Sequence, residues 1–155
     1  MSDIDRALAA VGIVLPAANA AAGCYVPAVR CGALLFVSGQ TPKTDGKVAY
    51  AGRVESDRDI ESARAAARLC AVNVLAQAKA ACEGDLSRVK RCVRIGGFVQ
   101  SGPSFHGQSA VIDAASDVFL AAFGDAGRHA RTSVGVAALP GDAMVEVDAI
   151  FEIEG

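Results

Sequence analysis

Apolar residues recur at helical spacing in two long segments of the chain. Residues 56–82 carry one apolar stripe and predict a long helix that Ser56 or Asp57 begins and Glu83-Gly84 ends. Residues 108–123 carry a second stripe and predict another helix, followed by Gly124 and Gly127. A short helix over residues 3–12 is also predicted. The stripe residues are Ile60, Ala63, Ala67, Ala71, Val74, Leu75, Ala78 and Cys82 in the first helix, and Val111, Ala115, Val118 and Phe119 in the second.

Strand patterns fill most of the remaining sequence. "YVPAVRCGALLFVSGQTP" predicts strands at about 25–30 and 33–38, and "KTDGK" predicts an Asp-Gly turn. "RVKRCVRIGGFV" predicts a strand with one solvated face. Residues 128–155 predict two strands joined at Pro140-Gly141 as a hairpin. In the "RVKRCVRIGGFV" strand, Val89, Arg91, Val93 and Ile95 would alternate with Arg88, Lys90, Cys92 and Arg94.

The resulting order is strand, strand, helix, strand, helix, strand, strand. This order favours an α+β fold in which two helices cover one face of a sheet. At 155 residues the chain is expected to form a single domain over 1–155, with 1–22 as an N-terminal extension.

Composition and charge narrow the function classes. Apolar residues make up 52% of the chain and the formal net charge is −2, which argues against a general binder of nucleic acid or anionic membranes. The five cysteines include no C-x-x-C pair, so we expect reduced thiols and a cytoplasmic protein. The apolar N-terminal run follows Asp3, Asp5 and Arg6, which is unlike a signal peptide. A protein that handles small molecules is the expectation.

The closing segment contains the candidate chemistry. Simple strand alternation predicts that Arg131, Ser133 and Glu146 share the sheet face turned away from the helices. Such a face is either an ordinary solvated surface or a site for a negatively charged ligand that also meets a carboxylate.

Three stretches resemble the Rid family, also called YjgF-like, of enamine and imine deaminases. They are "LLFVSGQTP", the long helix and above all "ARTSVGVAALPGDAMVEVDAIFEI", and the resemblance runs from about Tyr25 to Phe151. It implies a chorismate-mutase-like fold with a mixed sheet and a homotrimer with sites in the clefts between subunits. It also implies hydrolysis of small enamine or imine acids to keto acids and ammonia, without metal or cofactor. The implied partner is a small carboxylate-bearing metabolite.

The resemblance assigns roles residue by residue. Arg131 matches the family's carboxylate-gripping arginine, and Glu146 matches its water-positioning glutamate, so both are expected to be catalytic. Further substrate-binding positions are implied at Tyr25, at Ser38 and Gly39 in the Ser38-Gly39-Gln40 loop, and at Ser133, where many members have cysteine.

Some positions depart from the family pattern and indicate a divergent subgroup. Asp113 stands where better-known members have asparagine, and a carboxylate there would repel an acidic substrate if it faced the cleft. Cys24 replaces the usual proline before Tyr25. The N-terminal extension and the 98–110 loop are longer than in the family's compact form.

Several alternatives remain open at the level of sequence. His129 would either bond to backbone at a helix exit or shuttle protons, and His106 is expected to be solvated. No G-x-S-x-G motif supports a serine triad. The alternative functions are a non-catalytic binding protein for small carboxylates and an endoribonuclease or translation inhibitor. RNA binding would have to use the basic cluster of Arg88, Lys90, Arg91 and Arg94, near which Phe98 is the one aromatic residue.

Overall fold

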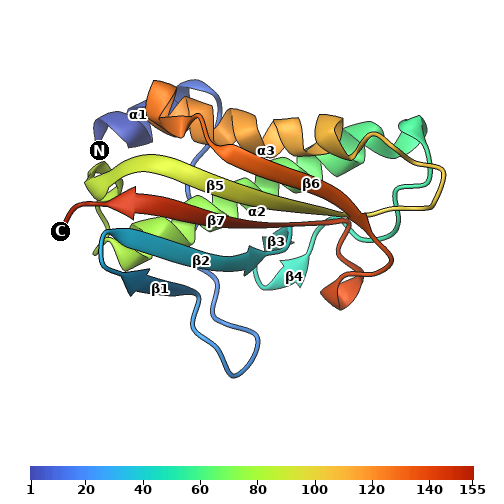
Figure 1. Cartoon of the computed structure of the whole chain (residues 1–155), viewed down its shortest axis with the longest axis horizontal. Helices are drawn as coiled ribbons and strands as arrows, with labels where there is room; N and C mark the ends of the chain where they lie inside the picture. The colour runs from blue at the N-terminus through green and yellow to red at the C-terminus, as the bar shows by residue number, and fades with distance from the viewer.

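The computed structural model describes all 155 residues, built around a five-stranded sheet (Figure 1). The order across the sheet is β1-β2-β7-β5-β6; only β5 and β6 are parallel, so the sheet is mixed. A small separate hairpin, β3 and β4, turns at Asp45-Gly46, where both residues have positive φ, as the Asp-Gly pattern predicts. The strands are β1 Ala28–Cys31, β2 Leu34–Gln40, β3 Lys43–Thr44, β4 Lys47–Val48, β5 Val89–Gln100, β6 Ala130–Val136 and β7 Val145–Ile153.

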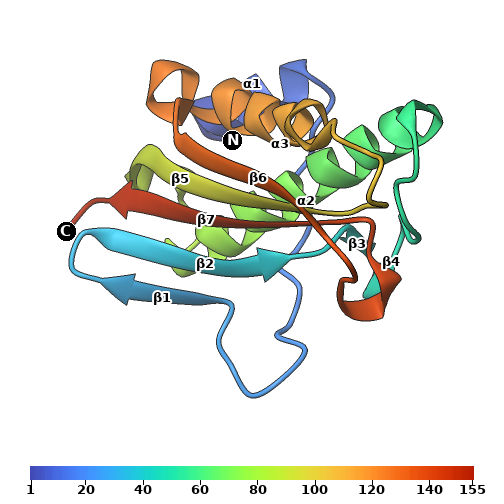
Figure 2. The same ribbon diagram turned by 45° about the vertical axis from the view of Figure 1, so that its right-hand side comes forward.

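Two long helices lie on one face of the sheet (Figure 2), which confirms the predicted α+β class. α2 (Ile60–Ala81) packs on β2 and β7, and α3 (Gln108–Phe123) packs on β5 and β6. Ser56 caps the one-turn helix η1 (Asp57–Asp59) that leads into α2. The other short helices are η2 (Leu86–Arg88), η3 (Gly124–Gly127) and η4 (Pro140–Asp142).

The core between helices and sheet is made largely of small side chains. Seven of the eight residues of the predicted apolar stripe are buried, and Ile60 is partly buried. On the sheet side, every second residue of β7 is buried, from Val145 to Ile153. Glu146 and Asp148 therefore lie on the opposite face of that strand.

The short helix α1 (Asp3–Ala10) packs against α3. Ser2 and Asp5 form its capping box, and Leu8 and Ile13 join the main core. The Nζ atom of Lys79 on α2 lies 2.8 Å from Asp5 Oδ1, so an ion pair also ties α1 to α2. None of the helices combines the length and the apolarity that a membrane crossing requires.

The predicted hairpin of residues 128–155 is wrong. β6 and β7 are not neighbours, because β5 lies between them and pairs with both. A crossover through α3 returns the chain parallel to β5, which places β6 at the sheet edge. Residues 137–144, with Pro140-Gly141 inside η4, then carry the chain past β5 to the central position between β5 and β2.

The predicted alternation along β5 is also wrong, although the strand itself lies where expected. Register shifts fall between Val89 and Arg91 and between Cys92 and Arg94. Each shift inserts an extra residue and reverses the face of the residues that follow. Cys92 is therefore buried, and Arg91 and Val93 are exposed.

Candidate functional site

Glu146, whose side chain lies on the face of β7 turned away from the helices, lines a cavity of about 280 Å³ that also reaches Gln77 of α2. Tyr25, Gly39, Gln40 and Gly141 contribute to the same cavity, together with residues 19–22 of the N-terminal segment. The structure thus brings together three of the residues that the resemblance implied: Tyr25, Gly39 and Glu146.

The Glu146 carboxylate is only partly hydrated. Burial raises its pKa above the ordinary value, and the nearby charge of Asp148 raises it further. The carboxylate lies so close to the backbone of residue 39 that a Cβ there would overlap Glu146 Oε1. Glycine at position 39 therefore gives Glu146 the space that it occupies.

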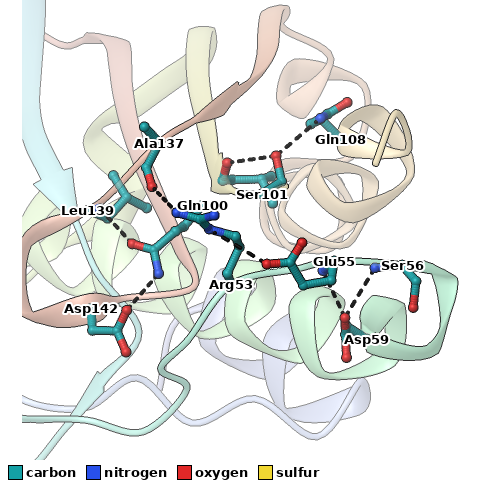
Figure 3. Close-up of polar contacts among 11 residues, drawn as sticks. Arg53, Glu55, Ser56, Asp59, Gln100, Ser101, Gln108, Ala137, Leu139 and Asp142 are labelled. Carbon is teal, nitrogen blue, oxygen red and sulfur yellow. Dashed lines mark hydrogen bonds and ion pairs between the residues drawn. The ribbon is translucent and has the colours of Figure 1, made fainter. Parts of the chain in front are cut away.

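Polar contacts, drawn in Figure 3, hold the loop that contributes Pro140 and Gly141 to the wall of this cavity. Gln100 is 4% exposed; its Nε2 donates to Asp142 Oδ1 at 2.7 Å, and its Oε1 accepts from the Leu139 amide at 2.7 Å. Arg53 Nη2 donates to the Ala137 carbonyl at 3.1 Å. These bonds hold residues 137–142, and with them Gly141, at the cavity.

Ser38 lies beside the cavity but does not line it. Its hydroxyl donates to the Val26 carbonyl at 2.9 Å, which ties β2 to the segment that carries Tyr25. Tyr25 itself is exposed, and its hydroxyl accepts from the Ala22 amide at 3.4 Å.

Arg131 lies on the other face of the sheet, which corrects the prediction that it shares a face with Glu146. In the parallel register Arg131 is opposite Ile95, a fully buried residue that faces the helices. Glu146 is opposite Phe98, which points away from them. The prediction assumed that the two strands of residues 128–155 pair directly with each other. In the structure each strand pairs with β5 instead, and that pairing decides which face each side chain occupies. Within one chain the two residues do not share a pocket.

The Arg131 guanidinium is held by α3. Its Nη1 donates to Asp113 Oδ1 at 2.7 Å and to Ser116 Oγ at 3.1 Å, and its Nη2 donates to the Ser109 carbonyl at 3.4 Å. Asp113 thus forms an ion pair with Arg131, although its own side chain is 57% exposed. Since a guanidinium has five N–H groups, two remain for a ligand.

Ser133 follows Arg131 on the same face of β6. Its Oγ is buried and has no hydrogen-bond partner. The structure thus places Ser133 and Asp113 with Arg131, on the opposite face of the sheet from the Glu146 side chain.

His129 contributes a second polar contact to the Arg131 region. A cavity of about 220 Å³ is lined by Ser116, Leu120, Arg128, His129 and Arg131. His129 Nδ1 lies 2.6 Å from the Gly127 carbonyl, and its Nε2 lies 2.9 Å from Ser116 Oγ. The predicted backbone bond is therefore present at Nδ1, and it leaves Nε2 available for the contact with Ser116. Burial lowers the pKa of His129, the Gly127 bond opposes that shift, and the charge of Arg131 lowers the pKa further.

Ser116 was missed at the level of sequence. The available signal was its position three residues after Asp113, which places both side chains on one helix face. No group of three or more His, Cys, Asp or Glu side chains is arranged to hold a metal ion.

Comparison with known proteins agrees with the fold. The family model described as "YjgF/chorismate mutase-like, putative endoribonuclease" matches residues 5–153. Protein TCP17 of Trypanosoma cruzi is 50% identical over 144 residues, which are 92% of this chain and 89% of that protein. A crystal structure of a protein of unknown function from Agrobacterium tumefaciens is 49% identical with a TM-score of 0.91, and the match covers 97% of this chain and 92% of that chain.

The yjgF gene product of E. coli is more distant. It is 30% identical with a TM-score of 0.63, over 87% of this chain and 92% of that chain. The match covers most of both chains, so the lower TM-score means that the two backbones superpose less closely. The chain therefore belongs to the YjgF-like (Rid) family, as a divergent member.

Proposed function

We propose that this protein hydrolyses reactive enamine or imine forms of small 2-amino acids to keto acids with release of ammonia. The observation that carries the proposal is the Glu146 carboxylate, partly desolvated and set against Gly39 in a cavity with Tyr25. A carboxylate with a raised pKa exchanges protons with water and with a leaving nitrogen more readily near neutral pH.

The second part of the proposal is that the complete site forms between copies of the chain. Arg131 and Glu146 lie on opposite faces of one sheet, so one copy offers the substrate a carboxylate anchor without the water-positioning group, or the reverse. β6 is an edge strand, which places Arg131 at the border of the molecule. A homotrimer with clefts between subunits, as the family resemblance implies, would join Arg131 of one copy to Glu146 of the next.

In such a cleft the two residues have different tasks. The free N–H groups of Arg131 bind the substrate carboxylate in ground and transition states alike. Glu146 holds the attacking water at the carbon of the C=N bond and assists proton transfer as ammonia leaves.

Enzyme assays on single variants test these tasks. The substrate is 2-aminoacrylate generated in place by a dehydratase, and keto-acid release is followed. Arg131→Ala should cost roughly 2–4 kcal/mol in kcat/KM, mainly through binding, and Arg131→Lys should not restore it. Glu146→Gln should lower turnover and leave carboxylate binding, measured by calorimetry, nearly intact. No acceleration by the wild type over the uncatalysed rate would refute the deaminase assignment. Carboxylate binding that depends on Arg131 without turnover would favour the binding-protein alternative.

Subunit mixing tests the shared site. Co-refolding equal amounts of Arg131→Ala and Glu146→Gln should restore activity to about a quarter of wild type, since each mixed trimer has one intact cleft. The matched control is the double variant co-refolded with wild type, in which intact chains alone supply the activity. A site contained in one chain would give no recovery in the first mixture, and light scattering that shows a stable monomer would refute the trimer.

The endoribonuclease named in the family description has less support from this surface. Three of the four basic-cluster residues lie in ion pairs: Arg88 with Glu83 at 3.1 Å, Lys90 with Glu154 at 2.5 Å and Arg94 with Asp148 at 3.8 Å. Neighbouring carboxylates thus offset much of the positive charge that a phosphate backbone would need.

A further inference from the structure

The Ser116 hydroxyl lies between Arg131 and His129, and its direction is fixed. A carbonyl oxygen can only accept, so the 2.6 Å contact to Gly127 requires the hydrogen on His129 Nδ1. Nε2 is then an acceptor, and Ser116 donates its own hydrogen to it. Arg131 Nη1 donates to the same oxygen. The result is a hydroxyl whose proton points to an imidazole and whose oxygen faces the arginine expected to hold substrate.

The imidazole is poised to receive that proton. Phe119 packs edge-on against the ring, with the two centroids 5.8 Å apart, and burial lowers the pKa of His129, which favours the neutral imidazole. The Gly127 bond fixes its orientation. A base held by a third group and hydrogen-bonded to a hydroxyl is the arrangement that moves protons in many hydrolases.

We propose that Ser116 and His129 form a proton relay on the Arg131 side of the site. The relay rests on the proposed deaminase function and adds a second proton-transfer group, opposite Glu146. The family resemblance seen in the sequence assigns no role to Ser116 or His129.

The proton balance is complete without any further reactant. As water attacks the C=N carbon, one water proton passes to Ser116 Oγ while the serine's own proton passes to His129 Nε2. The substrate enters as the protonated imine, so when the C–N bond breaks its nitrogen needs only the proton returned by the same path to leave as ammonia. As the keto C=O bond forms, the hydroxyl that came from water gives its remaining proton to the Glu146 carboxylate, which passes it to solvent. Arg131, close to the transient imidazolium, makes it a stronger acid at that second step.

The charges around His129 define its expected pH dependence. They are Arg131 on β6, Asp113 on α3 bonded to Arg131, and Arg128, which pairs with Asp125 at 3.4 Å. The relay needs neutral imidazole to start, so kcat/KM should fall as the pH drops through the lowered pKa of His129.

Turnover and its pH profile form the first test. Ser116→Ala and His129→Gln should each lower kcat about 30- to 100-fold. Ser116→Thr, which keeps a hydroxyl, should retain most activity. In His129→Gln the acid limb assigned to the imidazole should disappear, while affinity for the product-like carboxylate pyruvate stays within about twofold. His106→Gln and Ser62→Ala, an exposed histidine and an exposed helix serine, are the matched controls and should behave as wild type.

A structural role for His129 would instead weaken pyruvate binding and turnover together and leave the acid limb in place. That result overturns the relay while the deaminase function stands.

An NMR titration of His129 tests the relay without any assay of activity. Its pKa should rise in Ser116→Ala, which removes the donor to the neutral form, and in Arg131→Ala, which removes a neighbouring cation. An unchanged titration in Ser116→Ala would overturn the relay even in a protein that proves inactive. If the wild type showed no turnover but His129 titrated as expected, the deaminase function alone would be refuted.

Discussion

Glu146 carries its charge in a place where water reaches it poorly, and this has a stability consequence of known sign. Its pKa is higher in the folded than in the unfolded chain, so the folded state binds the proton more tightly. Stability is therefore lost as the pH rises through that pKa. At pH 8 the fold bears the full free-energy cost of keeping the Glu146 carboxylate ionised in its partly buried position.

Glu146→Gln should therefore raise the midpoint temperature of unfolding at pH 8 and change it less at pH 4, although it lowers turnover. Calorimetry at the two pH values measures this. Glu152→Gln on the same strand is exposed and should change neither value. The expectation would be contradicted if Glu146→Gln lowered the midpoint temperature relative to wild type at pH 8, or raised it more at pH 4 than at pH 8.

Asp113 raises a second residue-level question, because its carboxylate already occupies part of the Arg131 fork. A ligand carboxylate must share or displace it. Asp113→Asn keeps a hydrogen-bond acceptor and removes the competing charge, so pyruvate should bind about two- to fivefold more tightly, the size expected for an exposed ion pair. Calorimetry at low salt shows the effect best, and weaker binding would mean that Asp113 mainly orients Arg131.

At the scale of elements, helix α1 is attached by a pH-sensitive contact. The hydrogen bond from Lys79 lowers the pKa of Asp5 to about 2, with further contributions from Ser2. A carboxyl with a lowered folded pKa stabilises the fold above its unfolded pKa and loses that stabilisation as the pH falls toward 2. Asp5→Asn should therefore lower the unfolding temperature at pH 7 and make little difference near pH 2. A pH-independent effect of Asp5→Asn would mean that the Lys79 contact contributes nothing.

Helices and strands differ in how far sequence predicts them. The stripe of α2 and the bounds of α3 follow from local periodicity, because a helix makes its hydrogen bonds within one segment. The positions of the main strands also followed from the sequence pattern, but the order in which these strands pair did not. The placement of β7 between β2 and β5 depends on paired residues that are at least 46 positions apart in the chain.

The site shows the same division. The motif resemblance identifies Arg131 and Glu146 as site residues. Strand alternation predicted that they share one face of the sheet, whereas the observed pairing with β5 puts them on opposite faces. In β5 the two bulges place Val89, Cys92 and Ile95 on one face, whereas regular alternation grouped Arg91 with the apolar residues. Ser116 and His129 are joined only by the approach of α3 to β6, which sequence spacing does not encode.

At the scale of the whole molecule, the five thiols fall into two classes. Cys24 and Cys31 are exposed, whereas Cys70, Cys82 and Cys92 are buried, and burial raises the pKa of Cys92 to about 12. Since the thiolate is the reactive form, iodoacetamide at pH 7.5 should modify the two exposed cysteines and spare the buried three. Intact-mass spectrometry counts the adducts, and the doubly modified protein should keep its activity. Full modification of the native protein would mean that the core opens readily.

The central place of β7 has a consequence for biosynthesis. A ribosome makes every other strand and both covering helices before it makes β7, so the nascent chain holds an incomplete sheet with its apolar faces open. The core cannot close until this strand leaves the exit tunnel, so the sheet is expected to be completed only at that point. Chains stalled before residue 145 should remain bound by chaperones and sensitive to proteases, and those extended past β7 by a linker should become resistant in a single step.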